Sequence, residues 1–243
     1  MTSLGSRMVE CLGPIRVVNL PSRPDRRREF AAQLARIGLG FDHPQVSIFD
    51  AIRPESLAGF PTLGARGCFL SHLEILRAAR DADLPSIAIC EDDLDFSADF
   101  TSRAPDLLET LAARDWDMFY GGFDAVAHGM DVVPGLITLD PKQNVLCSHF
   151  MALRRPAIHA LVPYLTAITE REVGDLAGGP MHVDGAYSHF RADHPQMVTL
   201  SVSPTLGVQR PSRTDVHDLR WFDRVPVVRD TAQLYRRWRG AMR

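Results

Sequence analysis

Three adjacent carboxylates, Glu91, Asp92 and Asp93, carry the clearest chemical signal in this sequence. They follow the apolar residues 87–90, whose length and lead-in by Pro85 predict a buried strand. Because burying an unpaired carboxylate is costly, acids at a strand end must face water or a cation. Hard ions such as Mg²⁺ and Mn²⁺ prefer carboxylate oxygens. The triplet therefore indicates either a metal–nucleotide site at the carboxyl end of a sheet strand or an acidic turn.

Two other segments are candidates for binding phosphate. The first directly follows a predicted strand at residues 15–20 and contains Asn19, Arg23, Arg26 and Arg27. Arginine matches phosphate oxygens bidentately, although such a run is equally typical of a solvated helix face. The second is the segment 64–67, Gly-Ala-Arg-Gly, followed by Ser71 and His72. Its glycines would let backbone N–H groups approach an anion, but a small-residue helix start explains them about as well.

Composition places few limits on function. The 243 residues are 45% hydrophobic and 23% charged, with a net charge of −3, which is ordinary for a globular protein and gives no global attraction to nucleic acid. No segment resembles a secretory signal or a membrane span. The four cysteines have no CxxC spacing, so we expect reduced thiols in a cytosolic protein rather than disulfides or a zinc site. Walker, dinucleotide-binding, HExxH, GxSxG and protein-kinase motifs are absent from the sequence.

The order of predicted elements indicates an α/β fold with a mainly parallel sheet flanked by helices. Strands are expected at 15–20, 46–49, 87–90 and 117–120, and helices after Ser22 and Asp25, after Gly67, and at 106–113. The second half has short strands at 137–139, 149–153 and 197–202 around a helix at 157–165, a possible lid at 170–180, and a last helix after Asp230. We expect one domain over residues 1–243, with a nucleotide-binding half at 14–122 and an acceptor-binding half at 123–243.

Three motifs together resemble glycosyltransferase family 25, which includes bacterial lipopolysaccharide glycosyltransferases and collagen galactosyltransferases. They are Val17-Val18-Asn19-Leu20 with Arg23, Arg26 and Arg27; Gly64-x-x-Gly67-Cys68-x-x-Ser71-His72; and Ile87-x-Ile89-x-Glu91-Asp92-Asp93. Looser likeness continues at 148–153, at Val183-Asp184, and from Pro204 to Gln209 with Ser212 and Asp215.

The resemblance implies a GT-A-type fold and an inverting transfer of a hexose, galactose or glucose, from a nucleotide-diphosphate donor, with a UDP-sugar favoured. The acceptor would be a saccharide or a lipid-linked saccharide, in cell-surface glycan synthesis in the cytoplasm, with at most peripheral membrane contact at the inner face. Glu91 and Asp93 would hold Mn²⁺ or Mg²⁺, and His217 is a further candidate ligand. The expected nucleotide contacts are Asn19, Leu20, Arg23, Arg26, Arg27, Gly67, Ser71, His72, Glu91, Asp92 and Gln209.

An inverting transfer also needs a base for the acceptor hydroxyl. Asp184 is our first candidate, ahead of Asp124, because it follows a glycine-rich stretch and stands near Tyr187, a candidate sugar-stacking ring. A helix cap at Asp184 is the alternative. The competing functions are another metal-dependent nucleotide-utilising enzyme, such as a nucleotidyltransferase, and a non-catalytic nucleotide-sugar-binding relative. The C-terminal arginines (Arg236, Arg237, Arg239 and Arg243) are explained more simply by helix stabilisation than by a membrane.

Overall fold

The computed structural model describes residues 3–124, 129–133 and 135–210 of the chain, with only the backbone described at 129–133. The predicted last helix after Asp230, the C-terminal arginines, Ser212, Asp215 and His217 lie outside the described residues. Within the described part, the helices are α1 (Leu4–Leu12), α2 (Pro24–Arg36), α3 (Leu63–Asp81), α4 (Phe100–Ala112), α5 (Arg155–Glu170) and α6 (Val183–Asp193).

The fold class is α/β, as predicted, and all the strands in the described part of the chain join one sheet. The strands are β1 (Ile15–Asn19), β2 (Val46–Asp50), β3 (Ser86–Glu91), β4 (Leu94–Phe96), β5 (Met118–Gly122), β6 (Gly129–Val133), β7 (Leu136–Leu139), β8 (Phe150–Arg154), β9 (Thr199–Val202) and β10 (Gly207–Gln209). Their order is β2-β1-β3-β8-β5-β9-β7-β6, with β10 beside β4 and β5.

Strands from both predicted halves therefore share one sheet. In the first half, β2, β1 and β3 are parallel, as the alternation of strands and helices predicts. The second half inserts β8 antiparallel between β3 and β5, while β9 runs parallel to β5. The result is a mixed sheet whose parallel β2-β1-β3 region ends at one common edge.

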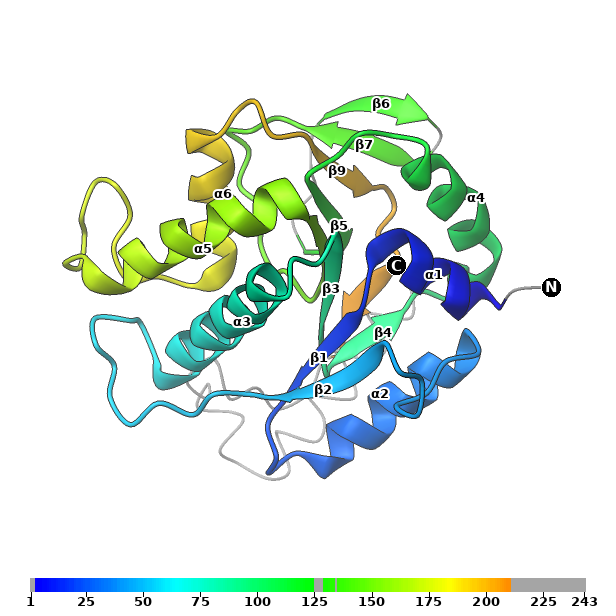
Figure 1. The fold of residues 1–243 in the computed structure, drawn as a ribbon, viewed down its shortest axis with the longest axis horizontal. Coiled ribbons are helices and arrows are strands. Elements are labelled where there is room, and N and C mark those ends of the chain that lie inside the picture. The colour runs from blue at the N-terminus through cyan, green and yellow to red at the C-terminus, as the bar shows by residue number, and fades with distance from the viewer. Residues whose placement is uncertain (1–2, 125–128, 134, 211–243) are drawn as a thin grey trace, which may run out of the picture.

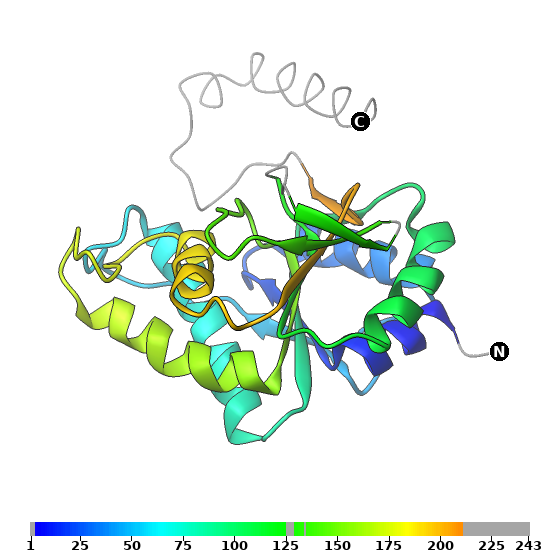
Figure 2. The same ribbon diagram turned by 90° about the horizontal axis from the view of Figure 1, so that it is seen from above.

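Two hydrophobic cores lie on opposite faces of this sheet (Figures 1 and 2). Helices α1, α2 and α4 cover one face, and α3, α5 and α6 cover the other. Side chains alternate between the two cores along β3: Ala88 and Cys90 face the first, and Ile87 and Ile89 face the second. Since successive strand residues point to opposite faces, a strand buried on both sides reads as a continuous apolar run, which explains residues 87–90.

Helix starts differ from two of the sequence-based expectations. The spacing of Ser22 and Asp25 is typical of a capping box, but Ser22 is not the N-cap of α2: Arg23 occupies that position without a side-chain capping bond, and Pro24 begins the helix. Helix α3 begins earlier than expected, at Leu63, because the hydroxyl of Thr62 accepts a hydrogen bond from the backbone N–H of Ala65 at 2.9 Å. Residues 64–67 are therefore the first turn of a helix and not a loop before it.

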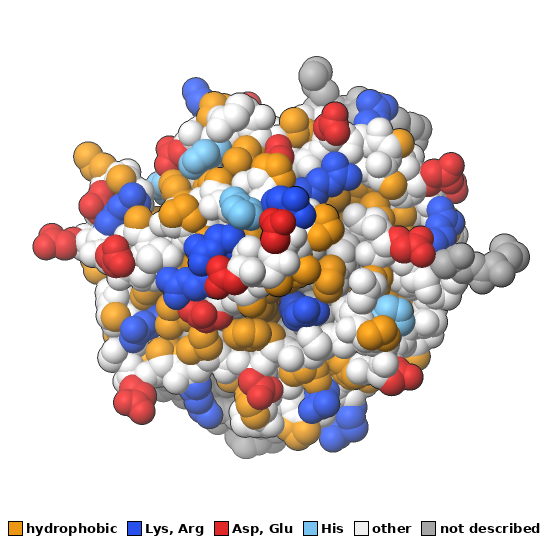
Figure 3. Space-filling model, in the orientation of Figure 1, with side chains coloured by type: hydrophobic (Ala, Val, Ile, Leu, Met, Phe, Trp, Pro, Cys, Tyr) orange, Lys and Arg blue, Asp and Glu red, His pale blue; other side chains and the backbone are white. Residues whose placement is uncertain are grey.

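Acidic and basic side chains are mixed over the face shown in Figure 3. Among the described helices, none has the length and apolar content needed to cross a membrane.

Candidate functional site

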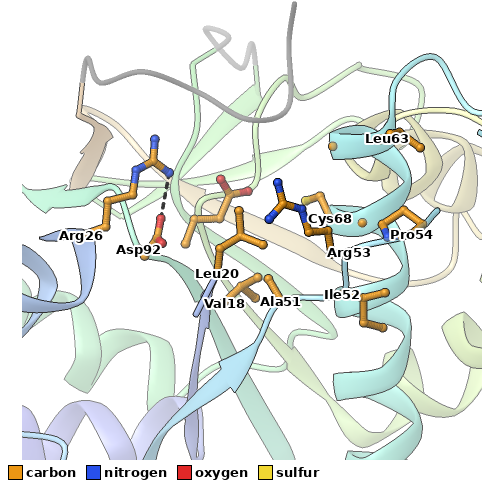
Figure 4. A pocket seen from close by; sticks show the side chains of 13 residues that line it. Val18, Leu20, Arg26, Ala51, Ile52, Arg53, Pro54, Leu63, Cys68 and Asp92 are labelled. Carbon is orange, nitrogen blue, oxygen red and sulfur yellow. Dashed lines mark hydrogen bonds and ion pairs between the residues drawn. The ribbon is translucent and has the colours of Figure 1, made fainter. Parts of the chain in front are cut away.

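A pocket of about 300 Å³ opens at the carboxyl edge of β1, β2 and β3, beside the first turn of α3 (Figure 4). Parallel strands of an open α/β sheet bind ligands at this edge. The lining residues come from the ends of the strands, the segment after β2 and α3: Val18, Leu20, Arg26, Ala51, Ile52, Arg53, Pro54, Leu63, Gly64, Gly67, Cys68, Glu91 and Asp92.

Two members of the acid triplet, Glu91 and Asp92, line this pocket, and Asp93 follows them in the chain. Glu91 ends β3, and Asp92 and Asp93 form the turn into β4. Both aspartates are buried, with exposed fractions of 5% and 4%. Because Asp92 and Asp93 cannot be hydrated there, their charges must be balanced by neighbouring groups.

Arg26 supplies most of that balance. Its Nη1 lies 2.9 Å from Asp92 Oδ1 and 3.1 Å from Asp93 Oδ2, and the guanidinium is itself buried. The Asn19 amide donates to Asp92 Oδ2 at 2.6 Å and to the Arg23 carbonyl at 3.1 Å. Asp92 is therefore held by a cation and an amide, which makes it a structural partner of Arg26 more than an open ligand.

Glu91 and Asp93 remain short of positive charge. Burial and the neighbouring carboxylates raise the pKa of Glu91, and burial raises the pKa of Asp93 despite Arg26. Asp93 Oδ1 is buried without a hydrogen-bond partner among the described residues. Gln209 donates from Nε2 to Glu91 Oε2 at 3.2 Å. Two crowded carboxylates, one with an orphaned oxygen, fit a divalent cation in the way the sequence predicts.

The remaining predicted nucleotide contacts divide into two groups. Leu20 and Gly67 line the pocket. Ser71 and His72 are fully buried and do not line it, so their prediction as direct nucleotide contacts does not fit the structure. The Ser71 hydroxyl donates to the Gly67 carbonyl at 2.7 Å and accepts from Ile52 N–H at 2.9 Å, which fixes the pocket segment after β2.

Two of the three predicted arginines also point elsewhere. Arg23 forms a bidentate ion pair with Asp25 beside the start of α2. Arg27 is exposed and lies over the ring of Phe41, 5.7 Å from its centroid, which is away from the pocket lining. Arg26 alone of the three lines the pocket.

Arg53 was missed at the sequence level. It lies three residues after the end of β2 and lines the pocket as an exposed cation that makes no ion pair with the described residues. Arg53 follows a parallel strand, as Arg23 to Arg27 do, so the same sequence signal predicts a phosphate-binding role for Arg53. Arg53 is the cation best placed to meet an anionic ligand.

Gly67 has a role different from the predicted phosphate cradle. A Cβ there would lie 2.4 Å from the Ile52 carbonyl oxygen, so only glycine lets α3 approach this segment so closely. The first turn of α3 nevertheless borders the pocket through Gly64 and Gly67, and a helix N-terminus favours negative charge.

The two candidate bases meet at Cys147. Asp184, in the first turn of α6, accepts from the backbone N–H of Cys147 at 2.9 Å. Asp124 is exposed, and its Oδ2 lies 3.6 Å from the Cys147 thiol, whose sulfur is also 3.9 Å from Gln209 Oε1. Asp184 and Asp124 are therefore linked through Cys147 to Gln209, whose amide donates a hydrogen bond to Glu91. Tyr187 is fully buried, which rules out the sugar-stacking role predicted for it.

Fold and site together define an α/β protein with a pocket at the carboxyl edge of its sheet that is lined by carboxylates, arginines and the first turn of a helix. Residues 13–122 match the model of Glycosyltransferase family 25 (LPS biosynthesis protein). The resemblance predicted from the sequence is thus confirmed over residues 13–122 of the chain.

Individual relatives cover part of the chain. Procollagen galactosyltransferase 1-B of Xenopus laevis is 31% identical over an alignment of 129 residues, and the match covers 44% of this chain and 20% of that protein. Inactive glycosyltransferase 25 family member 3 of Homo sapiens is 30% identical over an alignment of 144 residues, and the match covers 50% of this chain and 24% of that protein. The matched regions thus span a quarter or less of the length of these relatives. A glycosyltransferase involved in the glycosylation of the major capsid of PBCV-1 is similar with a TM-score of 0.43 and 9% identity, covering 82% of this chain and 93% of that one.

Proposed function

We propose that this protein is a metal-dependent inverting glycosyltransferase that moves a hexose from a nucleotide-diphosphate donor to a hydroxyl of a saccharide acceptor. The observation that carries the proposal is the pocket at the sheet edge, which Glu91 lines and where Asp92 and Arg26 lie on one side, opposite Arg53 and the first turn of α3 (Figure 4). A nucleoside diphosphate needs cations and N–H donors, and a bound metal needs carboxylates. This pocket offers both.

Glu91 and Asp93 are the residues that would hold the ion, since both are crowded carboxylates. A divalent cation bound there supplies Lewis acidity toward the leaving diphosphate. Arg53 would pair with the diphosphate oxygens, and Arg26 fixes the two aspartates so that the carboxylates stay in place. Gln209 would orient Glu91 through its amide.

Asp184 would take the proton from the acceptor hydroxyl. Its carboxylate accepts hydrogen bonds from the backbone N–H groups of Cys147 and Gly185, which hold it in one orientation. Asp124 is exposed beside it and would bind or orient the acceptor. A base must be positioned before its pKa matters, and the two N–H donors satisfy that requirement for Asp184.

The test is a thermal-shift screen of uridine, guanosine and cytidine diphosphate sugars, each with and without Mn²⁺. A ligand that binds only the folded state raises the apparent unfolding temperature. We expect one donor, a UDP-sugar, to stabilise the protein only when the ion is present. An unfolding temperature that rises equally with every nucleotide sugar, or that rises without Mn²⁺, would contradict the proposal. Consumption of nucleoside triphosphates would identify a nucleotidyltransferase instead.

A non-catalytic relative is the second candidate. It is favoured by the hydrogen bonds to Asp184, because both carboxylate oxygens are already engaged by backbone N–H groups, one of Cys147 and one of Gly185. A relative of this region is named as inactive. Ion-dependent donor binding without hydrolysis or transfer of the sugar would support this second function and exclude the first.

A further inference from the structure

A cluster of three different side chains lies at the wall of the pocket. The Cys68 thiol, a ring nitrogen of His72 and a carboxylate oxygen of Glu91 all lie within 4.8 Å of one another. Cys68 and His72 are one turn apart on α3, and Glu91 is at the end of β3. Among the residues that the structure describes, this is the only group of three or more His, Cys, Asp or Glu side chains whose ligand atoms all lie this close to one another.

His72 has the surroundings of a metal-ligating histidine. Its ring is fully buried, and burial lowers the pKa of His72 to about 4, so the ring is neutral at physiological pH. Nδ1 lies 3.0 Å from the Tyr187 hydroxyl, whereas Nε2 is buried without a hydrogen-bond partner in the described part of the chain. Ligating histidines hold one nitrogen in an outer hydrogen bond and present the other to the ion.

The electrostatic field at Cys68 also favours a cation. Burial raises the pKa of the Cys68 thiol, and Glu91, Asp184 and Asp93 raise it further. The negative charge that opposes a lone thiolate is the same charge that attracts a divalent ion, and a bound ion reverses the effect on the thiol.

The pocket provides access to the cluster. Cys68 and Glu91 line it directly, while His72 stands behind them, so a fourth coordination position would face the pocket. Three protein ligands with one open position is a common arrangement for Zn²⁺.

We propose that Cys68, His72 and Glu91 form a thiophilic metal site that binds Zn²⁺ or a similar borderline-soft divalent ion. Binding requires the thiolate, so the thiol proton of Cys68 is released to solvent as the ion enters. This site goes beyond the proposed transferase function, but it uses one of the same carboxylates. Occupancy by Zn²⁺ and use of Glu91 by the donor's metal therefore exclude each other, and Zn²⁺ should inhibit donor binding.

The required movement is small. With ordinary Zn–S and Zn–N bond lengths, ligand atoms in a tetrahedral site lie about 3.3–3.8 Å apart. The present separations of up to 4.8 Å would have to close by about 1 Å. Side-chain rotations of Cys68 and Glu91, whose groups border open space, can provide this without moving the helix.

Co²⁺ titration of the reduced, chelator-treated full-length protein tests the site, because thiolate ligation of Co²⁺ gives a charge-transfer absorption in the near ultraviolet. No nucleotide or acceptor is present, so the result is independent of the transferase proposal. We expect the band in the wild type, its loss in Cys68→Ser, and its displacement by Zn²⁺. Tyr187→Phe should weaken Zn²⁺ binding about tenfold by removing the outer hydrogen bond to His72.

Cys11→Ser is the matched control, because Cys11 lies on α1 and its thiol donates to the Leu108 carbonyl, outside the pocket. It should retain the band at full intensity. Absence of the band in the wild type would overturn the proposal. So would a band that survives in Cys68→Ser but is lost in Cys147→Ser, because Cys147 would then be the thiolate ligand.

Discussion

Gln209 donates a hydrogen bond from Nε2 to Glu91 Oε2 at 3.2 Å, across 118 positions of sequence. The contact exists because β10 pairs with β4 directly after the acid triplet, with Gln209 opposite Leu94. It joins the end of the described chain to the predicted metal carboxylates. The neighbouring residue continues the connection, since Arg210 N–H donates to the Asp93 carbonyl at 2.6 Å.

Arg26 is expected to be essential for stability, because it compensates two buried carboxylates at once. Arg26→Ala should lower the free energy of unfolding by about 3–5 kcal/mol, the usual cost of leaving buried charge unpaired. Urea denaturation would measure this. Mn²⁺ should recover part of the loss if it binds Glu91 and Asp93.

Arg27→Ala is the matched control for Arg26. Arg27 is adjacent in sequence but exposed over Phe41, so its removal should cost about 1 kcal/mol or less. Equal destabilisation by the two substitutions would mean that Arg26 does not carry the charge balance of the triplet.

Stability should depend on pH through Glu91. Its pKa is raised in the folded protein, so its favourable contribution is complete below the ordinary glutamate pKa and is lost as pH rises through the raised pKa. Glu91→Gln cannot ionise and should escape that loss. Without divalent metal, the variant should be the more stable protein at pH 8, by about 1 kcal/mol or more, with the difference shrinking toward pH 5.

Paired urea titrations of chelator-treated wild type and Glu91→Gln at pH 5 and pH 8 would check this. A constant difference at the two pH values would show that Glu91 is ionised normally and is not crowded by its neighbours.

Arg53 is expected to bind the donor directly. Arg53→Ala removes a cation that pairs with none of the described residues, so stability should change by less than about 0.5 kcal/mol. Donor affinity should fall by about tenfold or more through loss of a charge-assisted contact to phosphate. Calorimetric titration with the stabilising nucleotide sugar measures the change, and an unaltered Kd would remove Arg53 from the site.

The inward position of Arg26 had a signal in the sequence. Arg26, Phe30 and Leu34 follow one another at four-residue spacing, and all three are buried on one face of α2. Arg27 falls off that face. The arginines at 23, 26 and 27 are predicted as one group of nucleotide contacts. Helical periodicity separates buried Arg26 from exposed Arg27.

Most strands and helices could be predicted because apolar periodicity is local. Helix α1 was missed although Met8, Val9 and Leu12 have helical spacing after a Ser3 cap. The meeting of Gln209 with Glu91, and the insertion of β8 between β3 and β5, depend on strand pairing between distant segments. No local pattern encodes such pairing, so these parts of the site could not be predicted.

The cluster of Cys68, His72 and Glu91 was hidden for a similar reason. Cysteine spacing alone does not reveal it, because the cluster has one cysteine, a histidine one helical turn later and a carboxylate from another element. Four-residue spacing on a helix places Cys68 and His72 on one face. Only the packing of α3 against β3 adds the third ligand.

Asp184→Asn is expected to reduce the transfer rate about 10²- to 10⁴-fold with donor affinity unchanged, because it removes the base and keeps an oxygen for one of the two backbone N–H donors. Asp124→Asn, at the exposed acid beside Cys147, should affect acceptor KM more than kcat. The reverse pattern would make Asp124 the base. Full activity of both variants would show that neither aspartate is the base.

The central claim is that Glu91 and Asp93 hold a divalent ion that binds the donor, and Asp93→Asn tests it most directly. The substitution preserves shape near Arg26 while removing the charge beside the orphaned Oδ1. Thermal-shift measurements should show stabilisation of the wild type by a nucleotide-diphosphate sugar with Mn²⁺ and none in the variant, with both proteins folded. Equal stabilisation of the two proteins, or donor binding in the wild type that is indifferent to Mn²⁺, would contradict the account.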